Sequence, residues 1–261
     1  MVEIAGSIYV AATAAFVLAA CAVGLRLIGL HRRTGHAPEG LLGWGLLSSG
    51  GLGYGLMIFA VLSDQAAMAA GRASDAAALV CGIGWGLHNV GVLLMLRFVV
   101  IVYRPDSRWA RRLAVILGVV LWSGWLVFVA HGGLYGKQTA AYWVALGVIG
   151  SFPLWSMAES YAYYLRMKRR LAIGLADPLV CNRFLLWTLA SLCSLGAIWI
   201  VNAPLLVRPF VAEADLPGVT VISLLVTAVF GLGTVSMYWL TFFPPSWYRD
   251  RILAATSASR A

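Results

Sequence analysis

Long apolar stretches separated by short polar connections recur seven times along the chain. Each is long enough to cross the roughly 30 Å hydrocarbon core of a bilayer, which takes about 20 residues of helix. The predicted spans are about 8–30, 41–62, 77–103, 113–130, 140–165, 184–207 and 219–243. A lipid-exposed backbone must satisfy its own hydrogen bonds, and the alternating pattern of barrel strands is missing. The stretches are therefore predicted to be helices.

This pattern predicts an all-α integral membrane protein, a single seven-transmembrane-helix bundle over residues 1–261. The segment 244–261 begins with two prolines and is predicted to be a short basic amphipathic tail on the membrane surface. Composition agrees, because 61% of the residues are hydrophobic, 11% are charged and the mean hydropathy is +0.86. A soluble domain would carry about 25% charged residues, so a soluble protein is excluded.

The basic residues are distributed unevenly between the two sides of the predicted membrane. With the N-terminus outside, the inward-facing segments hold 16 of the 19 Lys and Arg residues, and the outer connections hold only Arg72, Lys137 and Arg208. By the positive-inside rule, the N-terminus is outside and the C-terminus is cytoplasmic. The sequence pI of 9.8 then reflects cations that face anionic lipid headgroups. Membrane lipids are expected partners, and nucleic acid is not.

Two charged residues lie within predicted spans at similar depth. Arg97 precedes the cytoplasmic end of the third span, and Glu159 precedes that of the fifth. At 1.5 Å per residue both lie about 10 Å inside the membrane. Opposite charges at equal depth predict an intramembrane ion pair, provided that the helices are neighbours. It would be either a static link between helices or a latch that ligand binding or partner docking breaks.

Polar residues near the middle of spans and near prolines are candidates for ligand binding. Pro153 and Pro204 lie inside predicted spans, where a proline frees a backbone carbonyl and kinks the helix. Kinks open cavities between helices, although they also occur in purely structural helices. The predicted ligand-binding residues are His88, Asn89, Trp155 and Asn202.

Two basic connections are candidates for docking a partner. The residues expected to take part are Arg104, Arg108, Arg111, Arg169, Arg170 and Asp177. In the second connection, leucines recur every four residues at Leu171, Leu175 and Leu179. This spacing predicts a short interfacial helix or, equally, a docking face for a cytoplasmic protein.

Glycine is concentrated in the second and third spans. Gly51 with Gly55, and Gly82 with Gly86, have the G-x-x-x-G spacing that allows close helix approach in lipid. They indicate packing within the bundle or, alternatively, a homo-oligomer interface on these two helices. The four cysteines have neither zinc spacing nor a C-x-x-C pair, so no metal site is expected.

In outline, seven spans with an outer N-terminus and short loops resemble the microbial rhodopsins. That family requires a lysine in the seventh span to bind retinal covalently. The two lysines here, Lys137 and Lys168, lie outside the predicted hydrocarbon region. Covalent retinal is therefore rejected and no cofactor is predicted, although apolar helices rich in aromatic residues would accommodate a non-covalent lipid or pigment.

Two loop phrases carry a second resemblance. They are YRPDSRWA at 103–110 and GLADP at 174–178, which is followed by Asn182 and Arg183. These phrases resemble those of a family of uncharacterised bacterial seven-transmembrane proteins, some of which are similar in outline to sensory membrane modules. The resemblance implies a multi-pass protein of the bacterial cytoplasmic (inner) membrane.

The sequence contains none of the H-E-x-x-H, G-x-S-x-G or P-loop motifs, so an enzyme is not expected. The expected function is a membrane sensor or receptor-like bundle. It would bind a small apolar or amphipathic ligand and couple to a partner through its basic cytoplasmic loops. The alternatives are an accessory subunit of a larger membrane complex and a small transporter or channel.

Overall fold

The computed structural model describes residues 1–69, 75–130 and 139–258, and it forms two compact units. Unit 1 consists of Met1–Thr13 and Pro153–Ala261, and unit 2 consists of Ala14–Phe152. The divisions fall inside helix α1 (Val2–Thr34) and inside helix α6 (Ala140–Ala172), where Pro153 begins the second part. The described residues form helices and turns without strands, which confirms the predicted all-α class.

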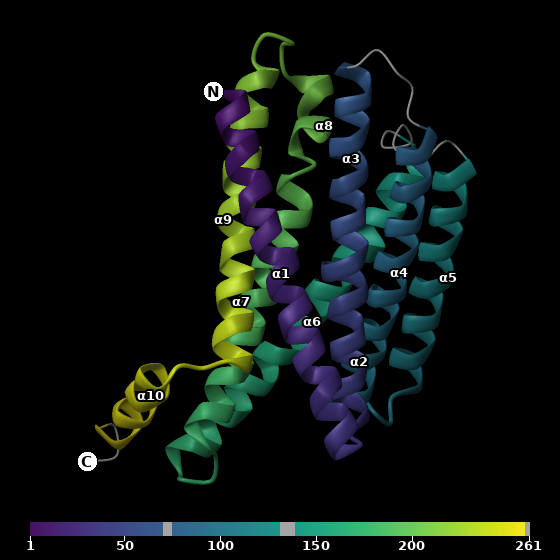
Figure 1. Cartoon of the computed structure of the whole chain (residues 1–261). Helices are drawn as coiled ribbons and strands as arrows, with labels where there is room; N and C mark the ends of the chain where they lie inside the picture. The colour runs from purple at the N-terminus through teal and green to yellow at the C-terminus, as the bar shows by residue number, and fades with distance from the viewer. Residues whose placement is uncertain (70–74, 131–138, 259–261) are drawn as a thin grey trace. The chain divides into compact units, whose positions relative to one another are not determined.

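Among the described residues, seven helices are long and apolar enough to cross a membrane, and each overlaps one predicted span. They are Val2–Thr34, Ala37–Ala69, Ala76–Tyr103, Arg108–Ala130, Ala140–Ala172, Pro178–Ile200 and Leu216–Phe242. Figure 1 shows them along the chain. Of the three basic residues expected on the outer side, Arg72 and Lys137 lie outside the described residues.

Unit 2 contains an interrupted second helix. Helix α2 (Ala37–Leu46) passes into a π-helix, η1 (Leu47–Gly53), and then into α3 (Tyr54–Ala69). All three segments pack against α4 (Asp75–Tyr103), which also packs against α5 (Arg108–Ala130). π-Helices are rare in proteins, and those that occur are often at functional sites. The part of α4 that η1 contacts is therefore a candidate functional region.

Unit 1 is built around the pairing of α7 (Pro178–Ile200) with α9 (Leu216–Phe242). A short α8 (Ala203–Val207) and the 3₁₀ turn η3 (Arg208–Phe210) join them, and α10 (Ser246–Ala258) follows α9. The chain N-terminus and α10 lie at opposite ends of unit 1 (Figure 1).

Helix α7 begins and ends earlier than the predicted span 184–207. It begins at Pro178 because Asp177 caps it, with Oδ1 accepting from the N–H of Leu179 at 2.7 Å. It ends at Ile200, since Pro204 has no N–H to extend the helical bonding. Pro204 thus lies in the first turn of α8, whereas Pro153 lies inside α6 as predicted.

The short interfacial helix predicted around Leu171, Leu175 and Leu179 is wrong. Leu171 belongs to α6 and Leu179 to α7, and the residues between them form a tight turn. Gly174 has a φ of +77°, and the Leu175 N–H donates to the Arg170 carbonyl at 2.8 Å. This helix-ending arrangement needs a left-handed residue, which glycine supplies without strain.

Candidate functional site

A small hollow in unit 2 lies between α4, α5 and the first turns of α6. It is lined by Trp85, Asn89, Gly124, Trp125, Phe128, Tyr142 and Ala145. The space open to the centre of a water molecule is about 10 Å³, which is room for roughly one water. As it stands, the hollow is therefore closed to anything larger.

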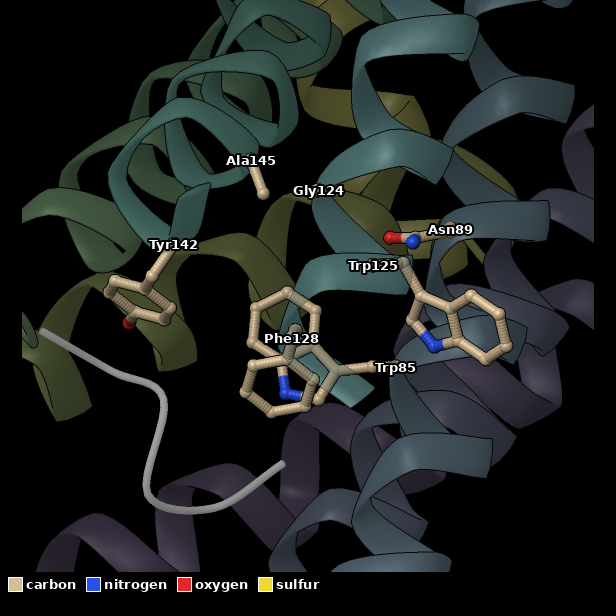
Figure 2. A pocket seen from close by; sticks show the side chains of 7 residues that line it. All are labelled: Trp85, Asn89, Gly124, Trp125, Phe128, Tyr142 and Ala145. Atoms are coloured by element: carbon tan, nitrogen blue, oxygen red, sulfur yellow. The ribbon is translucent and has the colours of Figure 1, made fainter. Parts of the chain in front are cut away.

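Asn89 provides the polar atom of this hollow. Its side chain is 1% exposed, and its Oδ1 is buried without a hydrogen-bond partner. In Figure 2 the Asn89 amide points from α4 toward Gly124 and Ala145. A buried carbonyl oxygen without a donor is costly, so this atom is suited to accept a hydrogen bond from a water or a ligand.

Aromatic rings form most of the wall. The Trp85 ring lies 5.4 Å from that of Phe128 and 6.2 Å from that of Tyr142, centroid to centroid. Trp125 is held in place because its Nε1 donates to the Gly82 carbonyl at 3.0 Å. Figure 2 shows the Phe128 and Trp85 rings between those of Tyr142 and Trp125. The wall thus offers ring faces and edges beside the unpartnered Asn89 Oδ1.

His88 connects this wall to the π-helix. Its ring makes an edge contact with Trp85 at 5.9 Å, and its Nδ1 lies 3.3 Å from the Ser49 carbonyl oxygen. The same oxygen accepts from the N–H of Tyr54, five residues further on, which is the bonding pattern of a π-helix. The imidazole therefore contacts η1 on one side and a wall residue of the hollow on the other.

Glycines bring the second helix and α4 into backbone contact beside His88. A Cβ on Gly91 would lie 2.5 Å from the Gly45 carbonyl oxygen and 2.5 Å from the Ser49 nitrogen. A Cβ on Gly53 would lie 2.7 Å from the His88 nitrogen. The close approach expected of these glycine-rich helices is therefore used within the chain.

The predicted G-x-x-x-G glycines are not the ones in closest backbone contact. A Cβ on Gly55, Gly82 or Gly86 would meet the nearest side chain at 3.6 Å, which is an ordinary contact. A Cβ on Gly51 would lie 2.7 Å from the Cys21 sulfur. Of the four motif glycines, Gly51 alone is tightly packed, against a side chain, and the backbone contacts are made by glycines outside the motifs.

The four predicted ligand-binding residues divide between the units. In unit 2, Asn89 lines the hollow and His88 contacts its wall at Trp85, whereas Trp155 and Asn202 belong to unit 1. Asn202 Nδ2 donates to the Ile198 carbonyl at 2.8 Å, so its amide satisfies backbone freed where α7 ends. Trp155 Nε1 donates to Glu159 one turn further along α6, at 3.3 Å.

The predicted ion pair also involves both units. Arg97 is an exposed residue of α4 in unit 2, whereas Glu159 is buried in α6 of unit 1, with 6% of its surface exposed. The hydrogen bond from Trp155 shows that the Glu159 side chain is oriented by its own helix. The pairing with Arg97 stays a prediction.

The basic candidates for docking lie at helix ends in both units. Arg104 follows α4, and its carbonyl accepts from the Ser107 N–H at 3.1 Å, while Arg108 and Arg111 are in the first turn of α5. Arg169 and Arg170 are in the last turn of α6, and the Asp177 carboxylate caps α7. All six side chains are exposed, as a docking role requires.

Sequence reasoning missed a polar interior in unit 1. Trp187 Nε1 and the Ser191 hydroxyl both donate to Ser156 Oγ, at 2.6 Å and 3.2 Å, and Ser194 Oγ lies 3.4 Å from Thr234 Oγ1. Five of the six buried residues of α9 are polar: Ser223, Thr227, Thr234, Tyr238 and Thr241. Their spacing along α9 could have predicted this polar face.

Comparison of the chain with protein-family models, with curated proteins and with solved structures gave no match. The interpretation of the site therefore depends on its geometry. Within residues 1–69, 75–130 and 139–258, no group of three or more His, Cys, Asp or Glu side chains could hold a metal ion. The chemistry that the hollow offers is hydrogen bonding to one oxygen and contact with aromatic rings.

Proposed function

We propose that the protein is a non-enzymatic membrane sensor that binds a small amphipathic ligand in the aromatic hollow of unit 2. The observation that carries the proposal is the buried Asn89 Oδ1, which lines the hollow without a hydrogen-bond partner. Ligand sites commonly combine apolar and aromatic walls with a few polar groups that orient the ligand. Here the polar group requires a ligand that carries one N–H or O–H donor.

In this proposal, the structure corresponds to the closed form of the site. The hollow has room for about one water, so a ring-sized ligand must displace wall side chains such as Trp85 or Tyr142. Displacement is itself a signal, because Trp85 contacts His88 and His88 lies against the Ser49 carbonyl of η1. Occupancy would thereby change the packing between α4 and the π-helix.

The proposed output side is the cytoplasm. Helix α4 runs from the hollow to Tyr103, directly before the basic turn with Arg104 and Arg108. The distribution of Lys and Arg supports an outer N-terminus and a cytoplasmic C-terminus, which places this turn on the inner side. The loop resemblance supports the bacterial inner membrane as the location, with a membrane or cytoplasmic protein as the partner.

Phenol and toluene form a matched pair of probes for the hollow, because phenol carries an O–H donor where toluene carries a methyl group. We expect phenol to bind the purified protein in nanodiscs about two- to tenfold more tightly than toluene, the effect of one net hydrogen bond. Quenching of tryptophan fluorescence measures the binding, since Trp85 and Trp125 line the site. Asn89→Leu should remove the preference for phenol.

Val90→Leu, at the exposed neighbouring position, is the matched control and should leave the preference unchanged. Equal affinity for phenol and toluene in the unmodified protein would contradict the proposal. A preference that persists in Asn89→Leu would also contradict it, because the donor would then be recognised elsewhere.

The buried polar face of α9 favours a second candidate function, a small transporter. Polar groups that follow one another along a membrane helix are typical of transport paths, and this face extends from Ser223 to Thr241. Liposomes containing only this chain and a trapped pH-sensitive dye test proton passage after an external acid step. Transport predicts a proton leak that Thr234→Val lowers and Ser236→Ala, on the exposed face, does not. A leak no greater than that of empty liposomes would exclude proton transport.

A further inference from the structure

One end of unit 1 carries a concentration of cations. Among the residues that the structure describes, seven exposed basic side chains lie there, on the end of α6, the start of α7 and α10, together with the acidic residues Asp177 and Asp250. The seven are Arg166, Lys168, Arg169, Arg170, Arg183, Arg249 and Arg251. In the part of the chain that the structure describes, none of them forms a salt bridge. Their charge is available to an external anion.

The turn between α6 and α7 exposes apolar side chains beside these basic residues. Ile173 is 70% exposed and Leu175 is 74% exposed. The turn is ordered by its own hydrogen bonds, from Gly174 N–H to Leu171 and from Leu175 N–H to Arg170, at 3.1 Å and 2.8 Å. The exposed pair is thus a fixed feature of the turn and remains uncovered within unit 1.

Helix α10 is attached to the same end. Asn182 Nδ2 in α7 donates to the Tyr248 hydroxyl of α10 at 2.9 Å, and the two helices pack together. The start of α7 and α10 therefore meet at Asn182, and the α6–α7 turn holds the end of α6 at the same end of unit 1 in Figure 1.

We propose that this surface binds the phosphate group of an anionic phospholipid. Unpaired Lys and Arg side chains at a membrane boundary attract anionic headgroups, and exposed Ile173, Leu175 and Trp247 supply the apolar contact that an interfacial site also needs. A lipid is favoured over a protein partner because α10 begins only four residues after α9 ends, which places it at the membrane surface. This inference does not depend on the proposed sensor function.

Native mass spectrometry of the full-length protein in detergent tests the inference with phosphatidylglycerol and phosphatidylcholine as probes. We expect phosphatidylglycerol to bind with a clear preference. Removing cations should weaken its binding by up to about fivefold for each one. The test variant is the triple change of Lys168, Arg169 and Arg170 to Gln, which alters only exposed side chains.

Two further variants distinguish a specific lipid-binding site from a general attraction of the lipid to positive charge. Changing Arg108, Arg111 and Arg112 to Gln removes the same charge from α5 of unit 2, and it should leave phosphatidylglycerol binding unchanged. Tyr248→Phe keeps the charge but removes the bond that holds α10, and it should weaken binding. Equal losses in both triple variants, or no loss in Tyr248→Phe, would overturn the proposal. Tighter binding of an acidic peptide such as poly-Glu than of the lipid would overturn it in favour of a protein partner.

Discussion

Replacing Asn89 by leucine tests whether the unpartnered Oδ1 lowers the free energy of unfolding of the protein when no ligand is bound. Leucine has the same branching at Cγ as asparagine, so the substitution removes the polar atoms while keeping the shape of the side chain. The site is 1% exposed, and the affected oxygen has no hydrogen-bond donor. The substitution therefore removes a penalty and breaks no bond of that oxygen.

The expected gain follows from the penalty for a buried unsatisfied acceptor, which is about 1–3 kcal/mol. Hydrogen bonds within membrane bundles contribute about 0.6 kcal/mol on average, so the lower part of that range applies. We expect Asn89→Leu to raise the free energy of unfolding by about 1 kcal/mol. Asn89→Asp should lower it by several kcal/mol, because it buries a charge without a partner.

Reversible unfolding in mixed micelles with increasing SDS, followed by helical circular dichroism, measures both changes. The protein must first be washed free of copurifying small molecules, since a bound donor would satisfy the oxygen and reverse the sign. A loss of 1 kcal/mol or more in Asn89→Leu, with no bound molecule detectable by native mass spectrometry, would refute the reasoning. It would show that the oxygen stabilises the fold itself.

Four other substitutions test packing and helix capping. Gly91→Ala should destabilise unit 2 by about 1–3 kcal/mol, because its Cβ would lie 2.5 Å from backbone atoms of the second helix. A Cβ added at Gly147 would meet no other atom within 4 Å, so Gly147→Ala should instead stabilise α6 by up to about 1 kcal/mol. Unfolding in SDS measures both changes in stability. Asp177→Ala should cost about 1 kcal/mol by removing the cap of α7, and faster proteolysis at the α6–α7 turn would reveal it. Trp187→Phe should lower the free energy of unfolding by about 0.6–2 kcal/mol, because it removes the hydrogen bond to Ser156. An unchanged free energy of unfolding would indicate that the indole N–H is satisfied elsewhere.

The helices were predictable because lipid imposes a simple requirement on them. A segment that crosses the hydrocarbon core must make all its backbone hydrogen bonds internally, and the common structure that does so is an α-helix. The length of the apolar stretches alone therefore identified seven helices. Helix ends follow from local chemistry that a hydropathy pattern does not weigh. Asp177 and Pro178 start α7 inside a segment that the leucine spacing predicts to be an interfacial helix, and Gly174 ends α6. Both signals are visible in the sequence once capping is considered.

The candidate site was only partly predictable. His88 and Asn89 were identified because polar residues in mid-span are costly. Trp85 shares their helix face but resembles any other aromatic core residue, and the rest of the wall comes from α5 and α6. The π-helix η1 was also missed, although the run LSSGGLG at 47–53 is a weak helix former. Which residues from different helices meet depends on packing that a single sequence does not contain.

The two units solve the same packing problem differently, and the difference gives Asn89 its significance. Because lipid tails are as apolar as leucine, helices in a membrane associate through close backbone contact or through polar side chains. Unit 2 brings α4 and the second helix together at glycines, and unit 1 joins its helices through hydroxyl groups. Thr227 Oγ1 is also buried without a partner, but a threonine hydroxyl can turn to a carbonyl of its own helix. The Asn89 oxygen can only accept, and none of the helix contacts described in unit 2 supplies it with a donor. Packing therefore does not account for this oxygen, which is why we propose that it accepts a hydrogen bond from a ligand.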